Sequence, residues 1–326
     1  MAKKSVSTNS TFKPAWWLRN KHLQTMWTRV SRRKLKVAIK KRRYELPDGD
    51  FLDTAWAGEG AHNPIVIILH GLGGSLRSPY AAGIMNSIVA HGWRAVFMYF
   101  RGASEEPNRL MRSYHSGDTG DFNFLVNEIR KANPGIPIFA VGFSLGGNVL
   151  LKWLGENKEK ANVKAAVAVS VPFDLPLAAN SLQKGFSRVY QWYLLTVLKR
   201  KYTAKFAPEK APISHKQVKA CRNFWTFDNT VTAPLHGFYD VHDYYRQCSS
   251  KHFIKDIRLP TLIIHAEDDP FMTTEVIPEH FHASSSVEFD ISPNGGHVGF
   301  ISGQIPGLAE YWLDQRILSF FSGKMN

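Results

Sequence analysis

The chain has 326 residues, of which 44% are apolar, and a formal net charge of +14 with a pI of about 9.7. This length and apolar content allow a sizeable hydrophobic core and exclude an intrinsically disordered chain. The apolar runs are too short to span a bilayer, and the polar start MAKKSVSTNS lacks the apolar segment of a secretory signal. The sequence therefore predicts a globular protein of the cytoplasm.

The N-terminal arm, to about residue 28, contains Trp16 and Trp17, which predicts that it packs onto the rest of the protein. Nine Lys and Arg residues follow between positions 29 and 43. A solvated, charged first hairpin explains this basic stretch most simply, and weak association with an anionic membrane surface is the alternative. Nucleic acid is not expected as a partner, because no recognition motif accompanies the stretch.

The segments after the arm predict a sheet with helices on both sides. An Asp-Gly turn at 48–49 between two strand-like runs is typical of a hairpin. Beyond it, unbroken apolar strands alternate with helices, the pattern of a mostly parallel sheet covered on both faces. Ser78 and Pro79 are expected to cap and open a helix that ends at Gly92. The expected strands are 37–46, 51–56, 64–69, 93–100, 136–141, 163–169, 261–265 and 287–291, and the other helices are 118–132, 144–156 and 306–321.

Residues 172–258 interrupt this alternation between two strands of the sheet. We expect an α/β core built from the arm and hairpin (1–60) and from 61–171 and 259–326, with 172–258 as a mainly helical cap. An insertion at the carboxyl ends of the strands would lie over the crevice where such sheets bind ligands. The segment is rich in aromatic residues. Most of them are expected to form the core of the cap, and a minority to line a pocket for an apolar substrate.

The sequence Gly142-Phe143-Ser144-Leu145-Gly146 matches G-x-S-x-G and lies between an expected strand and an expected helix. This context is that of a nucleophile elbow, in which a sharp turn exposes a serine and glycines prevent clashes between strand and helix. A glycine-rich turn with a solvent-exposed serine is the simpler alternative. The context favours Ser144 as the nucleophile.

A serine hydroxyl needs a general base, and in this arrangement the acid and then the histidine follow the serine along the chain. His297 lies in a Gly-Gly-His loop after the last strand, and Asp268 and Asp269 follow the strand before it. The surrounding Glu-x-Asp-Pro pattern favours Asp269 as the acid. Asp268, and more weakly Asp174, remain alternatives.

An oxyanion hole requires two backbone N–H groups close to the nucleophile. The residue after the serine, Leu145, is expected to provide one of them. The second is expected from the loop His70-Gly71-Leu72-Gly73-Gly74 after strand 64–69, with Leu72 the favoured donor. An ordinary strand-to-helix turn is the alternative interpretation of this loop.

Cysteine and histidine spacing does not suggest a disulfide framework or a metal centre. Cys221 and Cys248 lie far apart, which favours a reducing compartment. His280 and His282 form a single HxH pair, whereas a closed zinc site needs four ligands. We interpret both as surface histidines and expect neither a metal ligand nor a cofactor.

Taken together, these motifs resemble the YheT-like, or AB-hydrolase-4, branch of the α/β-hydrolase fold, and the resemblance covers nearly the whole chain. It is carried by segments more specific than G-x-S-x-G. These are Trp17-Leu18-Arg19-Asn20-Lys21-His22-Leu23-Gln24-Thr25, Arg101-Gly102, Glu106-Pro107-Asn108, Tyr114-His115-Ser116-Gly117, Phe227-Asp228, Gly237-Phe238, Tyr244-Tyr245 and Asp268-Asp269-Pro270-Phe271. Ala266 departs from the glycine common at the acid loop, and His-Gly-Leu-Gly-Gly departs from the HGGG of many lipases. His115 and Asp228 receive no role.

The resemblance implies hydrolysis of carboxylic esters (EC 3.1.1.-) with short- to medium-chain or monoacylglycerol-like acyl groups. The expected substrate is a small-molecule ester, with no obligate protein partner. Two alternatives stay open. One is an alcohol acyltransferase that uses the same acyl-enzyme, and the other is a non-catalytic lipid- or membrane-binding module that uses the basic stretch.

Overall fold

An eight-stranded sheet lies at the centre of the protein, in a computed structural model that describes residues 10–78, 80–278 and 283–325. The strand order is β1-β2-β4-β3-β5-β6-β7-β8, antiparallel across β1-β2-β4 and parallel from β4 to β8. The strands are β1 (Lys40–Glu45), β2 (Phe51–Ala57), β3 (Ile65–Leu69), β4 (Arg94–Met98), β5 (Ile138–Phe143), β6 (Ala165–Val169), β7 (Thr261–Ala266) and β8 (Val287–Ser292). This confirms the predicted, mostly parallel sheet.

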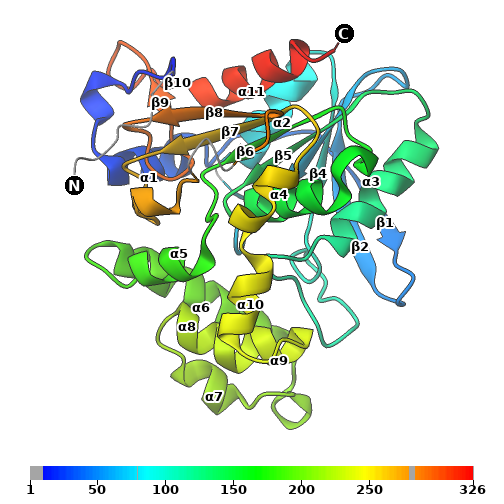
Figure 1. The fold of residues 1–326 in the computed structure, drawn as a ribbon, viewed down its shortest axis with the longest axis vertical. Helices are drawn as coiled ribbons and strands as arrows, with labels where there is room; N and C mark the ends of the chain where they lie inside the picture. Colours follow the sequence, from blue (N-terminus) through cyan, green and yellow to red (C-terminus); the bar gives the residue numbers. More distant parts are fainter. Residues whose placement is uncertain (1–9, 79, 279–282, 326) are drawn as a thin grey trace.

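Two pairs of helices cover the sheet from opposite sides (Figure 1). The helices α2 (Ala81–Ala90) and α11 (Trp312–Ser322) contact each other on one face. On the other face lie α3 (Gly120–Ala132) and α4 (Leu145–Asn157), which are joined by an edge-to-face contact of Phe122 with Trp153. Every residue of β3, β5, β6 and β7 is buried, as expected for strands enclosed on both faces. The carboxyl ends of these strands carry the loops described below.

The first hairpin places four of the nine residues of the basic stretch on the edge strand β1. Glycine suits its turn because Gly49 has φ +84°, a conformation in which a side chain is strained. Most of β1 is exposed, and charged side chains at a sheet edge discourage pairing with another chain. Three of these side chains also form ion pairs, Lys40 with Glu59 at 3.5 Å, Lys41 with Glu105 at 2.9 Å and Arg43 with Asp53 at 2.8 Å. This part of the stretch is accounted for by the hairpin itself.

Residues between β6 and β7 form a group of helices on one side of the sheet, which Figure 1 shows below the strands. They pack around a hydrophobic core of their own that includes Leu195, Val218 and Tyr244. Exposed aromatic residues were not expected here, yet Phe186, Trp192, Tyr193 and Tyr239 are exposed. The helices are α5 (Leu175–Ser181), α6 (Ser187–Lys205), α7 (His215–Ala220), α8 (Phe224–Phe227), α9 (Ala233–His236) and α10 (Val241–Cys248).

The N-terminal arm contains a helix, α1 (Lys21–Ser31), that the sequence reasoning did not identify. Asn20 caps this helix by accepting hydrogen bonds from the N–H groups of His22 and Leu23. Gln24, which is fully buried, fastens it to the rest of the protein: its amide donates to the carbonyls of Leu18 and Ile301 and accepts from the N–H of Ile301. The arm is therefore docked, and its helix faces the loop that contains His297.

Two predicted helix starts are wrong. The first turn of α2 is preceded by Tyr80, and Ser78 does not cap it: the Ser78 hydroxyl accepts from the N–H of Ser75 within a tight turn. Pro79 lies outside the described residues. The last helix begins at Trp312 and not at 306, because the preceding residues form strand β10 (Glu310–Tyr311), paired with β9 (Ile301–Ser302).

Candidate active site

Ser144 lies at a strained turn between β5 and α4. Its backbone has φ +53° and ψ −119°, which is rare for a residue with a side chain. Glycines permit this turn: a Cβ on Gly142 would lie 2.4 Å from the carbonyl oxygen of Gly146, and one on Gly146 would lie 2.4 Å from that of Leu69. The elements around the turn therefore approach more closely than any side chain would allow, and the serine projects from its apex.

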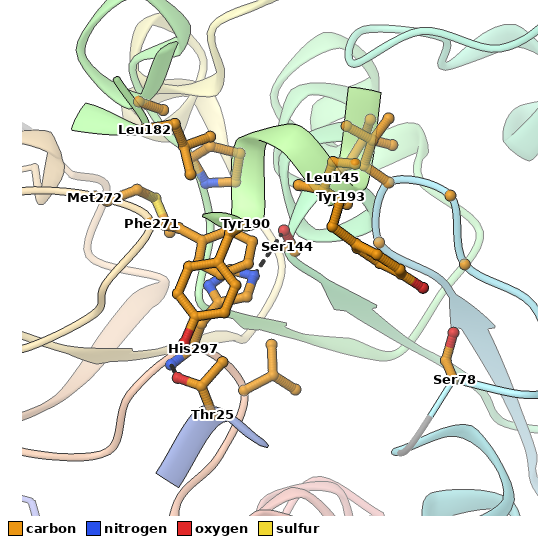
Figure 2. Close-up of a pocket in the computed structure, with 18 of the residues that line it drawn as sticks. Thr25, Ser78, Ser144, Leu145, Leu182, Tyr190, Tyr193, Phe271, Met272 and His297 are labelled. Atoms are coloured by element: carbon orange, nitrogen blue, oxygen red, sulfur yellow. Dashed lines mark hydrogen bonds between the residues drawn. The ribbon is translucent and has the colours of Figure 1, made fainter. Parts of the chain in front are cut away.

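The structure brings Ser144, His297 and Asp269 into one hydrogen-bonded chain, of which Figure 2 shows the bond between His297 and Ser144. The Nε2 of His297 lies 3.1 Å from the Oγ of Ser144, and its Nδ1 lies 2.8 Å from the Oδ2 of Asp269. The side chains are shielded from water, with exposed fractions of 9% for His297 and 1% for Asp269. The ring of Phe271 stacks on the imidazole with centroids 3.9 Å apart. The imidazole is thus held in a fixed plane with one nitrogen toward the serine.

The two adjacent carboxylates after β7 have different partners. Asp269 accepts from the His297 ring and, through its Oδ1, from the N–H of Phe271 at 2.8 Å. The carboxylate of Asp268 instead accepts from the N–H of Gly296 at 2.9 Å. Asp174 caps helix α5 and pairs with Lys251. Of the three acids considered from the sequence, Asp269 is therefore the one that contacts the histidine.

The loop that contains His297 is held by hydrogen bonds from two distant segments. The N–H of His297 donates to the Thr25 hydroxyl on α1 at 2.9 Å, and the N–H of Val298 donates to the Ser170 hydroxyl at 3.0 Å. A Cβ on Gly296 would lie 2.5 Å from the carbonyl oxygen of Lys21, so glycine is required where the loop crosses α1. The segment Trp17–Thr25 therefore holds the loop that contains His297. The sequence motif alone did not predict this role.

The two segments expected to provide oxyanion donors both adjoin Ser144: Leu145 follows it in the chain, and a Cβ on Gly71, in the loop after β3, would lie 3.2 Å from the Ser144 Cβ. Leu145 is the first residue of α4, where N–H groups lack intrahelical acceptors. In the loop after β3, tyrosine hydroxyls occupy the N–H groups on either side of Leu72: Tyr80 accepts from Gly71 and Tyr114 accepts from Gly73, each at 2.8 Å. Within the described part of the chain, the N–H of Leu72 has no acceptor. It is therefore available to a ligand.

His70 supports this loop from below. Its Nδ1 lies 2.7 Å from the carbonyl oxygen of Gly71, and its Nε2 accepts from the N–H of Phe100 at 3.2 Å. The N–H donor fixes the neutral tautomer with the proton on Nδ1. Burial lowers the pKa of His70 to about 3, and the charge of Lys201 adds a smaller effect in the same direction.

A cavity of about 520 Å³ opens above Ser144 and His297, and we call it the first cavity. Its lining is mostly apolar and comes from three parts of the chain. Helix α1 contributes Thr25 and Met26, the Gly71–Gly74 loop contributes Leu72, and the helices between β6 and β7 contribute much of the rest. Figure 2 shows Tyr190, Leu182 and Met272 around the serine and the histidine. This environment suits an apolar group attached to a polar reacting centre.

Two residues without an assigned role lie beside the helices between β6 and β7: Asp228 begins a short helical turn of that segment and lines the first cavity, and His115 packs against the segment. His115 packs edge-to-face on His236, and its Nδ1 accepts from the N–H of Gly117. Asp228 accepts from the hydroxyls of Thr232 and Tyr245, and burial raises the pKa of Asp228 to about 6. Neither contacts the Ser144–His297–Asp269 chain.

Comparison with known proteins identifies the class. Residues 64–304 match the family described as alpha/beta hydrolase fold. The chain belongs to this α/β-hydrolase family, as its sheet order and strained serine turn indicate.

Within the family, the chain is 45% identical to the protein named "Putative esterase YheT" of Escherichia coli (strain K12), over 95% of this chain and 93% of the relative. It is 31% identical to the "Monoacylglycerol lipase" of Saccharomyces cerevisiae, over 80% of this chain and 59% of the relative. The esterase Pf2001 of Pyrococcus furiosus has a similar fold, with a TM-score of 0.58 at 18% identity over 90% of this chain and 95% of that one. These findings confirm the YheT-like resemblance and identify an enzyme of the esterase type.

Among the described residues, no helix is long and apolar enough to cross a membrane. The same residues contain no cluster of three or more His, Cys, Asp or Glu side chains that could hold a metal ion. His280 and His282 lie outside the described residues.

The buried His70 makes stability depend on pH. The unfolded imidazole binds a proton below about pH 6.5, whereas the folded one does so only near its lowered pKa of about 3. Stability is therefore lost as the pH falls through this window, by about 2 kcal/mol from pH 7 to pH 5. His70→Gln keeps a donor and an acceptor but cannot titrate, so urea unfolding should show a smaller loss in this variant. Equal losses in both proteins would contradict this assignment.

Proposed function

We propose that this chain hydrolyses carboxylic esters through an acyl-enzyme formed on Ser144. The observation that carries the proposal is the hydrogen-bonded chain from Ser144 through His297 to Asp269, on a strained turn at the base of an apolar cavity. A nucleophile within reach of a base, which a third group orients, is the arrangement that activates a serine hydroxyl. Relatives named as an esterase and a lipase support the same reaction.

In the proposed mechanism, the Ser144 oxygen attacks the ester carbonyl while His297 takes the hydroxyl proton. The carboxylate of Asp269 stabilises the imidazolium, and the N–H groups of Leu72 and Leu145 bind the oxyanion. The carbon–oxygen bond to the alcohol then breaks, and His297 returns the proton to the departing alcohol. Water, deprotonated by His297, attacks the acyl-enzyme, the bond to Ser144 breaks, and His297 returns the proton to the serine oxygen as the acid leaves. These steps use only side chains and backbone of the chain itself.

The expected substrates are esters of short- to medium-chain acids or monoacylglycerol-like esters. The mostly apolar first cavity supports an aliphatic acyl group, and the yeast relative is named as a monoacylglycerol lipase. We further propose that residues 172–258 act as a cap on a core made of 1–60, 61–171 and 259–326. Helices of this segment line the cavity and would exclude water from the acyl-enzyme. The thiols Cys221 and Cys248 are both free, which supports a cytoplasmic location.

Removal of the nucleophile tests the proposal. With p-nitrophenyl esters from acetate upward, wild type should show turnover that peaks at a short or medium chain, and Ser144→Ala should lower kcat/KM by about 10³-fold or more. The exposed Ser285 provides the control, because Ser285→Ala removes a surface hydroxyl that does not line the first cavity. Activity that survives Ser144→Ala would overturn the assignment. If an added alcohol competes with water for the acyl-enzyme, a new ester of that alcohol will form, which would indicate acyl transfer.

The N-terminal arm should act on turnover through Thr25, which positions the His297 loop. Loss of its hydroxyl in Thr25→Val removes the acceptor for the His297 N–H, and the net worth of such a hydrogen bond, about 1 kcal/mol, corresponds to about a fivefold change. We expect kcat to fall about fivefold or more with little change in KM, and Thr25→Ser to restore it. A change in KM alone would indicate a role in substrate binding instead.

We also propose weak association with an anionic membrane surface beside the cavity. Helices α1 and α6 meet there, with the Arg29 guanidinium donating to the Tyr193 hydroxyl at 2.7 Å, and both helices line the first cavity. Their outer faces expose apolar side chains next to basic ones, a combination that favours anionic lipid. The exposed apolar residues are Leu23, Met26, Val30, Phe186, Val189 and Trp192.

Sedimentation with vesicles that contain anionic lipid tests this surface. Wild type should bind at low salt and release as salt is raised, because screening weakens the attraction. Trp192→Ser and Val30→Ser should reduce binding severalfold. Tyr239→Ser, at another exposed aromatic residue of the same helical segment, should leave it unchanged. Absence of wild-type binding at low salt would contradict the proposal.

A further inference from the structure

A second cavity, of about 230 Å³, lies beside the first. It lies between the helical segment and the segments that follow β3, β4 and β5. The two cavities share Leu72 and Leu145, the residues whose N–H groups are proposed to bind the oxyanion. An ester carbonyl bound by those groups would therefore lie where the two cavities meet. From that point one part of the ester extends into the first cavity and the other part into the second.

Lys201 lines the second cavity from helix α6. This helix packs directly on the Gly71–Gly74 loop, since a Cβ on Gly73 would lie 3.0 Å from a methyl group of Val197. Val197 lies one turn before Lys201. The Nζ of Lys201 is buried and has no hydrogen-bond partner in the described part of the chain. Burial lowers the pKa of this ammonium group. A buried cation without a partner is unfavourable, so an anion beside it would gain both charge pairing and hydrogen bonds.

The other charged side chains of this lining are already partnered. The ammonium of Lys205, one turn further on α6, donates to the side chain of Asn108 at 2.6 Å and to the carbonyl of Arg112 at 2.7 Å. Asp228 accepts from two hydroxyl groups, and Glu105 pairs with Lys41 at 2.9 Å. Burial lowers the pKa of His115 and His236, so both rings are neutral at pH 7. Lys201 is therefore the charged group in this lining that has no hydrogen-bond partner among the described residues.

We propose that the second cavity binds an anionic group, a phosphate or a carboxylate, on the alcohol portion of the substrate, with Lys201 as its counter-ion. The inference rests on the proposed esterase function and specifies its substrate class. The first cavity has the larger volume and the mostly apolar lining, which suits the acyl chain. The second has the unpartnered ammonium, which suits a short polar alcohol. An acyl ester of a small phosphorylated or carboxylated alcohol fits both cavities at once.

Paired substrates with one acyl chain test this preference. In the first pair, anionic 1-octanoylglycerol 3-phosphate is compared with neutral 1-octanoylglycerol. In the second, the anionic octanoyl ester of glycolic acid is compared with neutral ethyl octanoate. For wild type, kcat/KM should favour the anionic member of at least one pair, and the pair that shows it distinguishes phosphate from carboxylate. Lys201→Met should lower that ratio about 10- to 100-fold, as expected for loss of a charge-assisted hydrogen bond. Lys201→Arg should retain part of it.

The matched control is Arg200→Met, which removes the same charge from an exposed position on the same helix. Its ratio should equal that of wild type. An equal fall in Lys201→Met and Arg200→Met would indicate long-range attraction and overturn a bound anion in the cavity. So would a ratio that Lys201→Met leaves unchanged.

A binding measurement separates this inference from catalysis. In the Ser144→Ala background, glycerol 3-phosphate or glycolate should raise the melting temperature in a concentration-dependent way, and the additional Lys201→Met change should abolish the shift. If the melting temperature does not rise but wild type still hydrolyses neutral esters, only the anion site is overturned. A shift without ester turnover in wild type would retain the site and overturn the proposed function.

Discussion

The close approach of backbone around Ser144 is the constraint on which the rest of the structure depends. Strand β5, helix α4 and the end of β3 meet at distances that leave no room for a Cβ on Gly142 or Gly146. The same crossing forces the serine into a left-handed conformation and holds it there by the hydrogen bond from its N–H to the carbonyl of Val169 at 2.8 Å. Local strain of this kind persists only where surrounding structure fixes it, and here buried strands surround the turn.

Once the serine is fixed, the remaining groups must reach it from distant parts of the chain. The parallel sheet solves part of this problem, because strands β7 and β8 end at the same edge and place Asp269 and His297 side by side. The N-terminal arm solves another part. Its Thr25 hydroxyl accepts from the N–H of His297, and its buried Gln24 bonds to Ile301 further along the same segment, so the N-terminal arm determines where this late loop lies. Leu72 and Leu145 then line both cavities.

Much of this arrangement follows from sequence patterns, and the exceptions have physical causes. Continuous β-branched runs identify the buried strands, and the motif around Ser144 identifies the turn, since both depend on neighbouring residues only. Helix α1 was missed because its contacts are long-range: Gln24 and Thr25 are ordinary polar residues until Ile301 and His297 are placed beside them. The choice between Asp268 and Asp269 needed the loop conformation, which points adjacent side chains in different directions.

The unpartnered Lys201 was equally invisible in the sequence, where it is one of many basic residues. Lys201 differs from most of the other basic residues because its ammonium is buried, in a helix that packs on the Gly71–Gly74 loop. Only the packing of α6 determines this burial. The same holds for the exposed aromatic residues of α6, whose composition suggested a core. The proposed function therefore depends on contacts between the helical segment, the arm and the sheet, in addition to the motif itself.

Covalent labelling shows whether Ser144 is the nucleophile that His297 activates. The native protein is incubated with a fluorophosphonate, digested and analysed by mass spectrometry. We predict one adduct, on the peptide that contains Ser144, and a labelling rate reduced by orders of magnitude in folded His297→Ala. An adduct on a different serine would contradict this assignment. So would protein that is fully labelled on Ser144 and still hydrolyses esters at the unlabelled rate.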